Sequence, residues 1–463
     1  GSVSQCVLPL LTEHLVDAKQ ITIFDQRDNR ARVQSTLSQG ATYVQDQITR
    51  ENLDSTLSKY LSEGDFLLDL AWNIDANTIL QWCHDKGVLY LNTSIEQWDP
   101  YEGGASKSPI DRTLYYRHMR MREMKAKWNT LGATAIVEHG ANPGLVSHLV
   151  KKALVDIATR ALKEGKASKE VESALANDSY NLLAHSLGVK VIHIAERDTQ
   201  VTDKPKQLNE FVNTWSVEGF YEEGIAPAEL GWGTHEKLLP PNAYEHTSGP
   251  RNQIAIAQPG ATTWVRSWVP HCEITGMVVR HGEAFTLSDH LTVWNGDKAL
   301  YRPTVHYAYC PSNEAIVSMR ELEMRQWDLT PNQRIMNDEI TDGEDRLGVL
   351  LMGHPYKSWW TGSLLSIHDS RKLIPNQSAT TVQVASAVYA AVAWAMANPN
   401  KGLLVPDDMP WREVLPYAEK YWGGFHSDAA DWTPLQTRND LFAGWNNRKF
   451  DTSDPWQFTN FLA

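Results

Sequence analysis

Apolar runs of strand length alternate with helical patterns through the first third of the chain. The strand-like runs cover residues 21–25, 42–47, 66–71, 88–93 and 134–138, and the helical patterns cover residues 5–14, 28–38, 51–61, 76–85 and 109–130. Such alternation predicts a parallel sheet whose strands are joined by crossover helices. Apolar residues at helical spacing then run from Leu145 to Leu162, so we expect a further helix to lead out of this sheet.

Beyond Lys169 the pattern changes to short strand-like runs separated by Pro and Gly, as at residues 189–194, 264–268 and 273–279. This change is typical of a mixed α+β domain. We therefore predict the α/β fold class with two domains, residues 1–143 and residues 144–463. An alanine-rich helix at about residues 381–397 should be buried, and the sequence leaves open whether it packs back on the first domain.

Composition and charge narrow the functional classes. The chain has 463 residues, 42% of them hydrophobic, and a formal net charge of −13. Its Lys and Arg residues are scattered apart from residues 117–127, where Glu123 interrupts them, and this argues against nucleic acid as a partner because phosphate binding needs a concentrated basic face. We expect no membrane span and no secretion signal. The cysteines (Cys6, Cys83, Cys272 and Cys310) lack metal-ligand or redox spacing, so we expect free thiols, no metal site and a cytoplasmic location.

The first residues resemble the second half of a dinucleotide fingerprint. Gly1, Ser2 and Val3 precede a helical run, and a strand ending in Asp25 follows. We expect a Rossmann domain whose first strand lies before residue 1, with the pyrophosphate at the helix N-terminus. A carboxylate at Asp25 suits the ribose hydroxyls of NAD, although Arg27 keeps NADP open. Ser4 stands where a third glycine is usual.

Further polar residues follow the predicted strands. Asn73, Asn92 and Thr93 come at strand ends, and Asn142 lies in the turn before the helix that leaves the sheet. In open α/β sheets the ligand binds at the carboxyl ends of the strands. We therefore expect these four residues to border the nicotinamide, although Asn is also common in ordinary turns.

The second domain is rich in carboxylates and tryptophans. Glu196, Trp215, Glu223, His281 and Glu283 stand in such clusters. A carboxylate beside an aromatic face suits an alkyl-ammonium, which gains charge pairing and roughly 0.5 to 2 kcal/mol of cation–π attraction. For any single glutamate, a solvated surface position is the alternative, and the tryptophans are by default core residues.

Short strings along nearly the whole chain resemble bacterial-type homospermidine synthase. They are GANPGLVS at 140–147, IHIAERDTQ at 192–200, VNTWSVEGF at 212–220, PAELGWGT at 227–234 and DTSDPWQF at 451–458. The resemblance implies a saccharopine-dehydrogenase-like catalytic domain after the Rossmann domain, a homodimer, and NAD as retained cofactor. It also implies the reaction, in which two putrescines give homospermidine and ammonia, with spermidine as a further donor left open.

The matching strings also imply roles for particular residues. Glu196 and Glu223 would hold ammonium groups, and Trp215 would stabilise the charged intermediate by cation–π contact. His281 is the candidate for proton transfer, with a hydrogen-bonded structural histidine as the alternative. Asn142 would orient the reacting amine. Weaker candidates for the cation site are Glu283 and Asp345.

Two other functions remain open from the sequence. A saccharopine-type amino-acid dehydrogenase would need arginines for the carboxylates of its substrates, whereas the motifs here are rich in Glu and Trp. A catalytically silent NAD or polyamine sensor would bind both ligands without releasing ammonia. An assay for homospermidine and ammonia separates the three functions.

Overall fold

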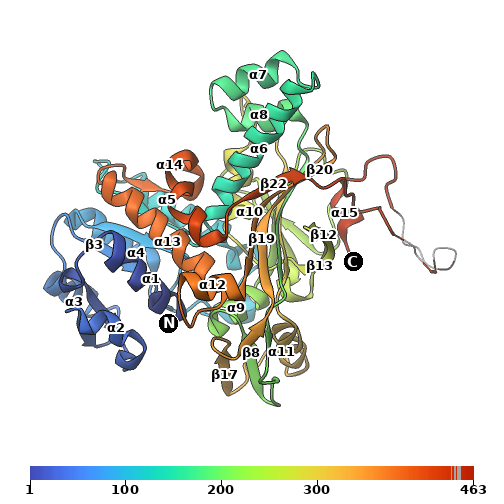
Figure 1. Ribbon diagram of the computed structural model, residues 1–463. Helices are drawn as coiled ribbons and strands as arrows, with labels where there is room; N and C mark the ends of the chain where they lie inside the picture. The colour runs from blue at the N-terminus through green and yellow to red at the C-terminus, as the bar shows by residue number, and fades with distance from the viewer. Residues whose placement is uncertain (439–440, 443–444, 446–449) are drawn as a thin grey trace. The chain divides into compact units, whose positions relative to one another are not determined.

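The computed structural model describes residues 1–438, 441–442, 445 and 450–463. These residues form two compact units (Figure 1). Unit 1 comprises residues 1–106, 117–145 and 368–422, and unit 2 comprises residues 107–116, 146–367 and 423–463. The chain thus returns to unit 1 after most of unit 2 is complete. The domain boundary at residues 143 and 144 stays a prediction.

Unit 1 holds a parallel α/β arrangement. Its elements, whole or in greater part, are α1 (Ser2–His14), β1 (Thr22–Asp25), α2 (Gln34–Ser38), β2 (Thr42–Gln45), α3 (Leu53–Tyr60), β3 (Phe66–Asp69), α4 (Ala76–Lys86), β4 (Leu89–Asn92), α5 (Leu114–Lys125), β5 (Ala135–Ile136), α12 (Ile367–Leu373), α13 (Ala379–Ala397), β21 (Leu403–Leu404) and α14 (Trp411–Glu419). β1 pairs with β2, and the order β21-β5-β4-β3 forms a second sheet. All of these pairings are parallel, which confirms the expectation from the alternating pattern.

The alanine-rich helix expected at about 381–397 is α13, which packs against α1 and α14 in unit 1. By length and composition alone α13 could cross a membrane, but 89% of its most apolar window is buried inside the structure. Small side chains allow α13 to be packed closely on several sides, and Ala385, Ala387 and Ala391 are fully buried. The same buried position is typical of a core helix.

Unit 2 is built on a large mixed sheet. Its elements are α6 (Leu145–Lys163), α7 (Lys169–Ala176), α8 (Tyr180–Leu187), β6 (Val191–Asp198), β7 (Val201–Thr202), β8 (Glu210–Asn213), α9 (Val217–Ile225), β9 (Pro227–Gly231), β10 (Ala243–Glu245), β11 (Gln253–Pro259), β12 (Trp264–Val269), β13 (Cys272–Met277), α10 (Glu283–His290), β14 (Val293–Asn295), β15 (Lys298–Tyr301), β16 (Thr304–Cys310), α11 (Asn313–Met324), β17 (Asn332–Ile335), β18 (Ile340–Asp342), β19 (Glu344–Met352), β20 (Ser358–Ser366), β22 (His426–Ala429) and α15 (Phe458–Phe461). The predicted mixed α+β character of this half is confirmed.

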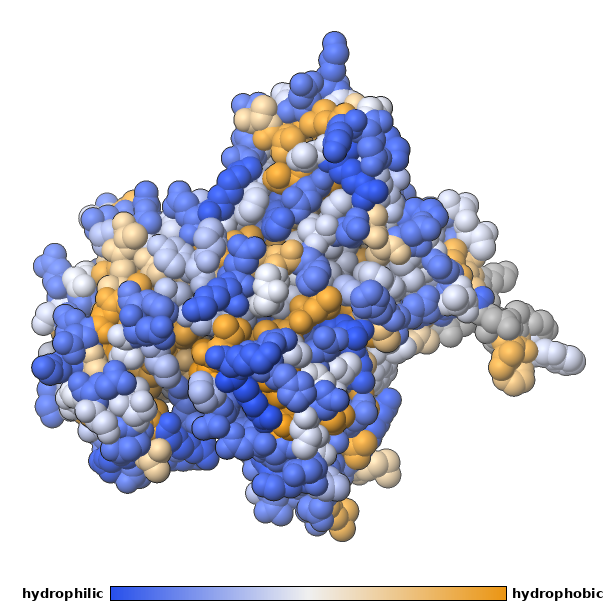
Figure 2. Space-filling view, in the orientation of Figure 1, coloured by the Kyte–Doolittle hydropathy of each residue, from blue (hydrophilic) through white to orange (hydrophobic). Residues whose placement is uncertain are grey.

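The strand order of the large sheet is β10-β11-β9-β16-β6-β19-β20-β22, with β12 and β13 joined to it through β16. β6 pairs in parallel with β16 and antiparallel with β19, so it lies near the middle of the sheet. Figure 1 labels β19 and β20 of this sheet, and it shows α7 and α8 beyond the end of α6. In Figure 2 that α7–α8 part is mostly hydrophilic with some apolar side chains exposed, and Leu182 of α8 is 45% exposed.

One predicted helix is wrong in extent. Residues 109–130 do not form a single helix, because a 3-10 turn at Pro109–Arg112 ends at Thr113, whose backbone is extended. The Thr113 hydroxyl accepts a hydrogen bond from the backbone N–H of Tyr116 at 3.2 Å, which is the geometry of a helix cap. α5 therefore begins at Leu114, and it ends at Lys125.

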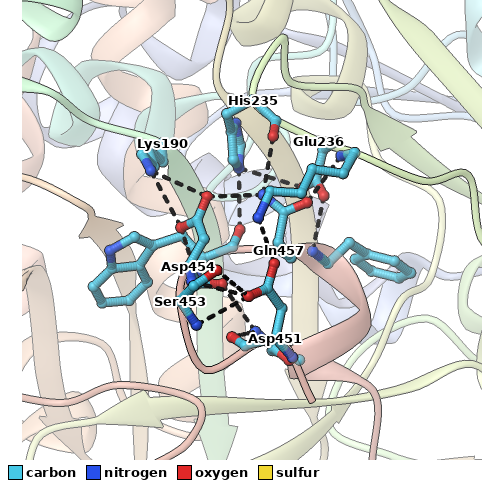
Figure 3. A network of polar contacts seen from close by, with 11 residues as sticks. Lys190, His235, Glu236, Asp451, Ser453, Asp454 and Gln457 are labelled. Carbon is cyan, nitrogen blue, oxygen red and sulfur yellow. Dashed lines mark hydrogen bonds and ion pairs between the residues drawn. The ribbon is translucent and has the colours of Figure 1, made fainter. Parts of the chain in front are cut away.

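The last matching string, residues 451–458, lies in a polar network near the first residues of β6 and β16 (Figure 3). Lys190 forms an ion pair with Asp454 at 3.2 Å. Glu236 is buried and accepts hydrogen bonds from the Thr304 hydroxyl at 2.6 Å and the Phe458 N–H at 2.9 Å. The string therefore attaches the C-terminal segment to unit 2.

Candidate active site

The centre of the large sheet presents an acidic face. In the strand register, Asp345 of β19 lies opposite Asp198 of β6, and Tyr309 of β16 lies beside Glu196 of β6. Side chains at paired positions, and at every second position along a strand, point to the same face of a sheet. Glu196, Asp198, Tyr307, Tyr309 and Asp345 therefore share one face, and all of them are buried.

The partners of these carboxylates come from neighbouring strands and loops. The Tyr307 hydroxyl donates a hydrogen bond to Oε2 of Glu196. Asp198 accepts from the Thr214 hydroxyl at 2.7 Å and from the Gln200 N–H at 2.8 Å. Burial nevertheless raises the pKa of Asp198, because these bonds only partly offset the loss of water around the anion.

Trp215 stands between β8 and α9 at the edge of this acidic face. Its indole N–H donates to the Tyr309 hydroxyl at 2.9 Å. Its ring also lies 5.7 Å from the ring of Phe220, one turn into α9. The indole is half-buried, so part of its surface remains available to a ligand.

Two successive residues of α9 pair with two successive residues after β13. Glu222 and Arg280 form a buried ion pair. Next to it, His281 Nε2 lies 3.3 Å from Glu223, and His281 Nδ1 lies 3.5 Å from Glu283 at the start of α10. The imidazole is thus held between two carboxylates.

This arrangement determines the charge of His281. Burial by itself disfavours the imidazolium, but Glu223 and Glu283 together outweigh it and raise the pKa of His281 to about 10. The side chain is therefore a cation at neutral pH, and it can donate a proton but cannot begin as a base. The ordinary pKa of ~6.5 assumed from the sequence does not apply here.

Tyr307 joins the two groups of residues. Its ring meets the ring of His281 edge to face at 4.4 Å and stacks on Tyr309 at 5.1 Å, while its hydroxyl contacts Glu196. The unit 2 residues singled out in the sequence, from Glu196 to Asp345, therefore gather in one cluster. Tyr307, Tyr309, Glu222 and Arg280 were missed. The sequence shows that Tyr307 and Tyr309 alternate along one strand. It does not show that this strand, β16, pairs with β6, which carries Glu196.

In unit 1, the residues expected to hold a dinucleotide lie at the N-terminus of α1, at the ends of β1 and β4, and in the loops that follow β3, β4 and β5. Gly1 precedes the first turn of α1, where the N–H groups of Ser2 and Val3 have no partner one turn earlier in the helix. Asp25 ends β1 and is half-buried. It accepts from the Arg27 N–H at 2.9 Å and the Asn29 side chain at 2.8 Å, and a carboxylate has capacity for further donors.

The remaining unit 1 candidates differ in what they can offer a ligand. Asn73 has φ +59, and its amide oxygen is buried without a hydrogen-bond partner among the described residues, as expected for a ligand contact. Asn92 is already engaged, since it accepts from the Glu138 N–H at 2.7 Å and donates to Tyr90 at 3.0 Å. Thr93 and Asn142 are half-buried.

The carboxylate of Asp25 can accept hydrogen bonds from ribose hydroxyls, which fits a dinucleotide whose ribose carries free hydroxyls. Among the described residues, no group of three or more His, Cys, Asp or Glu side chains is placed to hold a metal ion. The four cysteines are free thiols.

Comparison with known proteins gives full-length matches. Residues 1–136 match the family model of the saccharopine dehydrogenase NADP binding domain, and residues 140–423 match that of the saccharopine dehydrogenase C-terminal domain. The homospermidine synthase of Mesorhizobium japonicum is 40% identical over 472 residues, covering 100% of this chain and 95% of the relative. The homospermidine synthase of Blastochloris viridis is also 40% identical, over 474 residues, with 100% and 96% covered.

A solved structure is similar throughout. The homospermidine synthase of Legionella pneumophila, crystallised in complex with NAD, superposes with a TM-score of 0.88 at 36% identity and covers 100% of this chain and 96% of its own. The resemblance and the two-part fold expected from the sequence are therefore confirmed.

Proposed function

The chain belongs to the homospermidine synthase family, and we propose that it joins two putrescine molecules into homospermidine with release of ammonia. The family assignment rests on relatives that match from end to end. The observation that carries the proposal for this chain is the cluster of Glu196, Trp215, Glu223, His281 and Glu283, in which Trp215 and Glu223 are half-buried and the other three residues are buried. Because buried carboxylates need cations as partners, a site of this kind favours a polycationic ligand.

The charged ends of the diamine are the groups that this cluster would bind. Glu196 and Glu223 would each accept hydrogen bonds from an ammonium, and Asp345 and Glu283 would add negative potential. The half-buried face of Trp215 would lie against the carbon that becomes positive during the reaction, where an indole gives the strongest cation–π contact. An amino-acid substrate would need arginines to bind its carboxylates. Arg280, which lies beside the cluster, already forms an ion pair with Glu222, so the cluster suits a diamine better than an amino acid.

His281 would act as a proton donor, and substrate binding would make its proton easier to release. The imidazolium is held by Glu223 and Glu283. An ammonium bound at Glu223 would compete for that carboxylate, and burial would then lower the pKa of His281. A proton would pass to the amino group that leaves, which departs as ammonia. The distal ammonium would stay charged and hold the chain in place.

NAD is the cofactor that this chain would use. When bound, it takes a hydride from the amine-bearing carbon and later returns it to the new imine. The N-terminus of α1 at Gly1, Ser2 and Val3 would hold the pyrophosphate, and Asp25 would accept from the ribose hydroxyls. The other residues expected at this site are Asn73, Asn92, Thr93 and Asn142. The similar Legionella protein was crystallised with NAD.

Three finer expectations remain proposals. A homodimer and the use of spermidine as a second donor follow from the family resemblance. A cytoplasmic location is supported by four free thiols, which suit a reducing compartment.

The test is incubation of the full chain with putrescine and NAD, followed by chromatography for homospermidine and an ammonia assay. We expect the two products in equal amounts, with no net accumulation of reduced cofactor. Reduced cofactor without homospermidine would instead indicate a dehydrogenase. Binding of both ligands without product would indicate a sensor. The control is Glu172→Gln, a substitution on the exposed face of α7 that should leave the product ratio unchanged.

A further inference from the structure

Two tyrosines connect the anionic and the aromatic parts of the cluster. Tyr307 and Tyr309 are alternate residues of β16 and face the same side as Glu196. The Tyr307 hydroxyl donates to Glu196, and the Tyr309 hydroxyl accepts from the indole N–H of Trp215 at 2.9 Å. The two phenol rings stack with centroids 5.1 Å apart and planes within 12°. One continuous chain of contacts thus runs from carboxylate to indole.

The surroundings hold this chain of contacts in place. Tyr307 and Tyr309 are 4% and 1% exposed. Phe220 meets the Tyr309 ring edge to face at 5.4 Å, and it also touches Trp215. A buried ring that is stacked on one side and hydrogen-bonded at its end has little freedom to rotate. The spacing between Glu196 and the indole is therefore set by β16.

Both phenols keep their protons. Burial, and next the charge of Glu196, raise the pKa of Tyr307 and of Tyr309 well above 10. Neither hydroxyl can therefore become a competing anion in the site over the pH range in which an enzyme works. They can serve only as hydrogen-bonding neutral groups, which suits a role in holding other residues.

We propose that Tyr307 and Tyr309 are positioning residues of the cation site. Tyr307 acts through Glu196 and Tyr309 acts through Trp215, so that the carboxylate and the indole face meet the two parts of one diamine at a fixed separation. This inference rests on the proposed function, because it assumes that both partners contact the substrate.

The role of Tyr309 should appear in turnover. With Tyr309→Phe the indole N–H loses its acceptor, and the indole can turn away from the carbon that becomes positive. We expect kcat to fall about tenfold, the size expected for one buried hydrogen bond to an oriented group, while KM for putrescine changes less. In a Trp215→Phe background the same substitution should have almost no further effect, because the group it positions is gone.

The role of Tyr307 should appear in the pH dependence. Loss of a hydrogen bond donated to a carboxylate favours the protonated form of that carboxylate. Tyr307→Phe should therefore move the acid limb of the kcat/KM profile to higher pH. In a Glu196→Gln background the limb should not move further with Tyr307→Phe.

The matched control is Tyr301→Phe, which removes a buried tyrosine hydroxyl that donates to the backbone of Val189 at 2.8 Å, away from the cluster. It should change neither kcat nor the pH profile. Effects of Tyr307→Phe and Tyr309→Phe that persist fully in the Trp215→Phe and Glu196→Gln backgrounds, or that Tyr301→Phe reproduces, would overturn the proposal. An unsubstituted chain that makes no homospermidine would instead overturn the proposed function.

A second measurement tests whether the indole of Trp215 is fixed without substituting either tyrosine, so it does not depend on whether the tyrosine variants fold. In the unsubstituted chain labelled with 5-fluorotryptophan, the fluorine resonance of Trp215, assigned with Trp215→Phe, should be a single sharp line before and after putrescine is added. A line broadened by exchange between two ring orientations would contradict a fixed indole.

Discussion

The charge of His281 offers a sharp test of the site, through the substitution Glu223→Gln. The imidazole has Glu223 at 3.3 Å and Glu283 at 3.5 Å, and its pKa is raised from 6.5 to about 10 against the effect of burial. That rise corresponds to on the order of 5 kcal/mol at ~1.36 kcal/mol per pKa unit. Because burial opposes this rise, Glu223 and Glu283 together contribute more than that, and removing the charge of Glu223 should take away at least ~2 to 3 kcal/mol.

The sign of the linked stability follows from the raised pKa. The folded chain binds this proton more tightly than the unfolded chain, so the stabilisation is fully present below about pH 6.5 and is lost as the pH rises to about 10. In Glu223→Gln the pKa of His281 is raised less, so the stability that is lost with rising pH should be smaller, and the loss should be complete at a lower pH.

The assay is NMR of the chain with 15N-labelled histidine, in which the His281 signals are assigned with His281→Gln. In the unsubstituted chain His281 should remain an imidazolium at pH 8, and in Glu223→Gln it should lose its proton roughly two pH units earlier. The control Glu172→Gln should leave the titration unchanged. A His281 that titrates near pH 6.5 in the unsubstituted chain, or whose pKa Glu223→Gln does not change, would show that the two carboxylates do not hold its proton.

Three further substitutions test other parts of the account. Asp25→Ala should weaken NAD binding about tenfold by calorimetry and NADP binding less, and an unchanged ratio of the two affinities would contradict the ribose assignment. Gly219→Ala should lower kcat/KM for putrescine several-fold, since its new Cβ would lie 3.0 Å from Cζ3 of Trp215 and the indole would have to shift; unchanged kinetics would contradict it. Burial lowers the pKa of His306 to about 4, so the unfolded chain gains a proton first as pH falls below about 6.5, and the melting temperature should fall towards pH 5 less steeply in His306→Gln.

The sequence predicted the parallel sheet of unit 1 because strand and helix periods are local properties. The alternation from residue 21 to residue 138 appears as β1 to β5 in the structure. The extent of a helix is less certain from the pattern, as Thr113 shows. Its backbone is extended, which ends the preceding turn, and its hydroxyl caps α5.

The sequence predicted most of the charged residues of the candidate site, but not the residues that hold them in place, such as Tyr307. Glu196 and Trp215 stand in the strings that carry the resemblance in the sequence, so they could be singled out as candidates. Tyr307 could not be connected to Glu196, because that contact depends on β16 lying beside β6, a pairing between segments more than a hundred residues apart. The cationic state of His281 was also hidden, since burial and the distance to Glu223 are properties of the folded chain.

A crystal structure of the chain with NAD and putrescine bound would show whether the cluster holds the diamine. We expect ammonium nitrogens within hydrogen-bond distance, ~2.7 to 3.2 Å, of Glu196 and Glu223, and the indole of Trp215 within ~6 Å of a positive centre of the substrate. A diamine bound away from this cluster, with Glu196 and Glu223 occupied only by Tyr307 and His281, would contradict it.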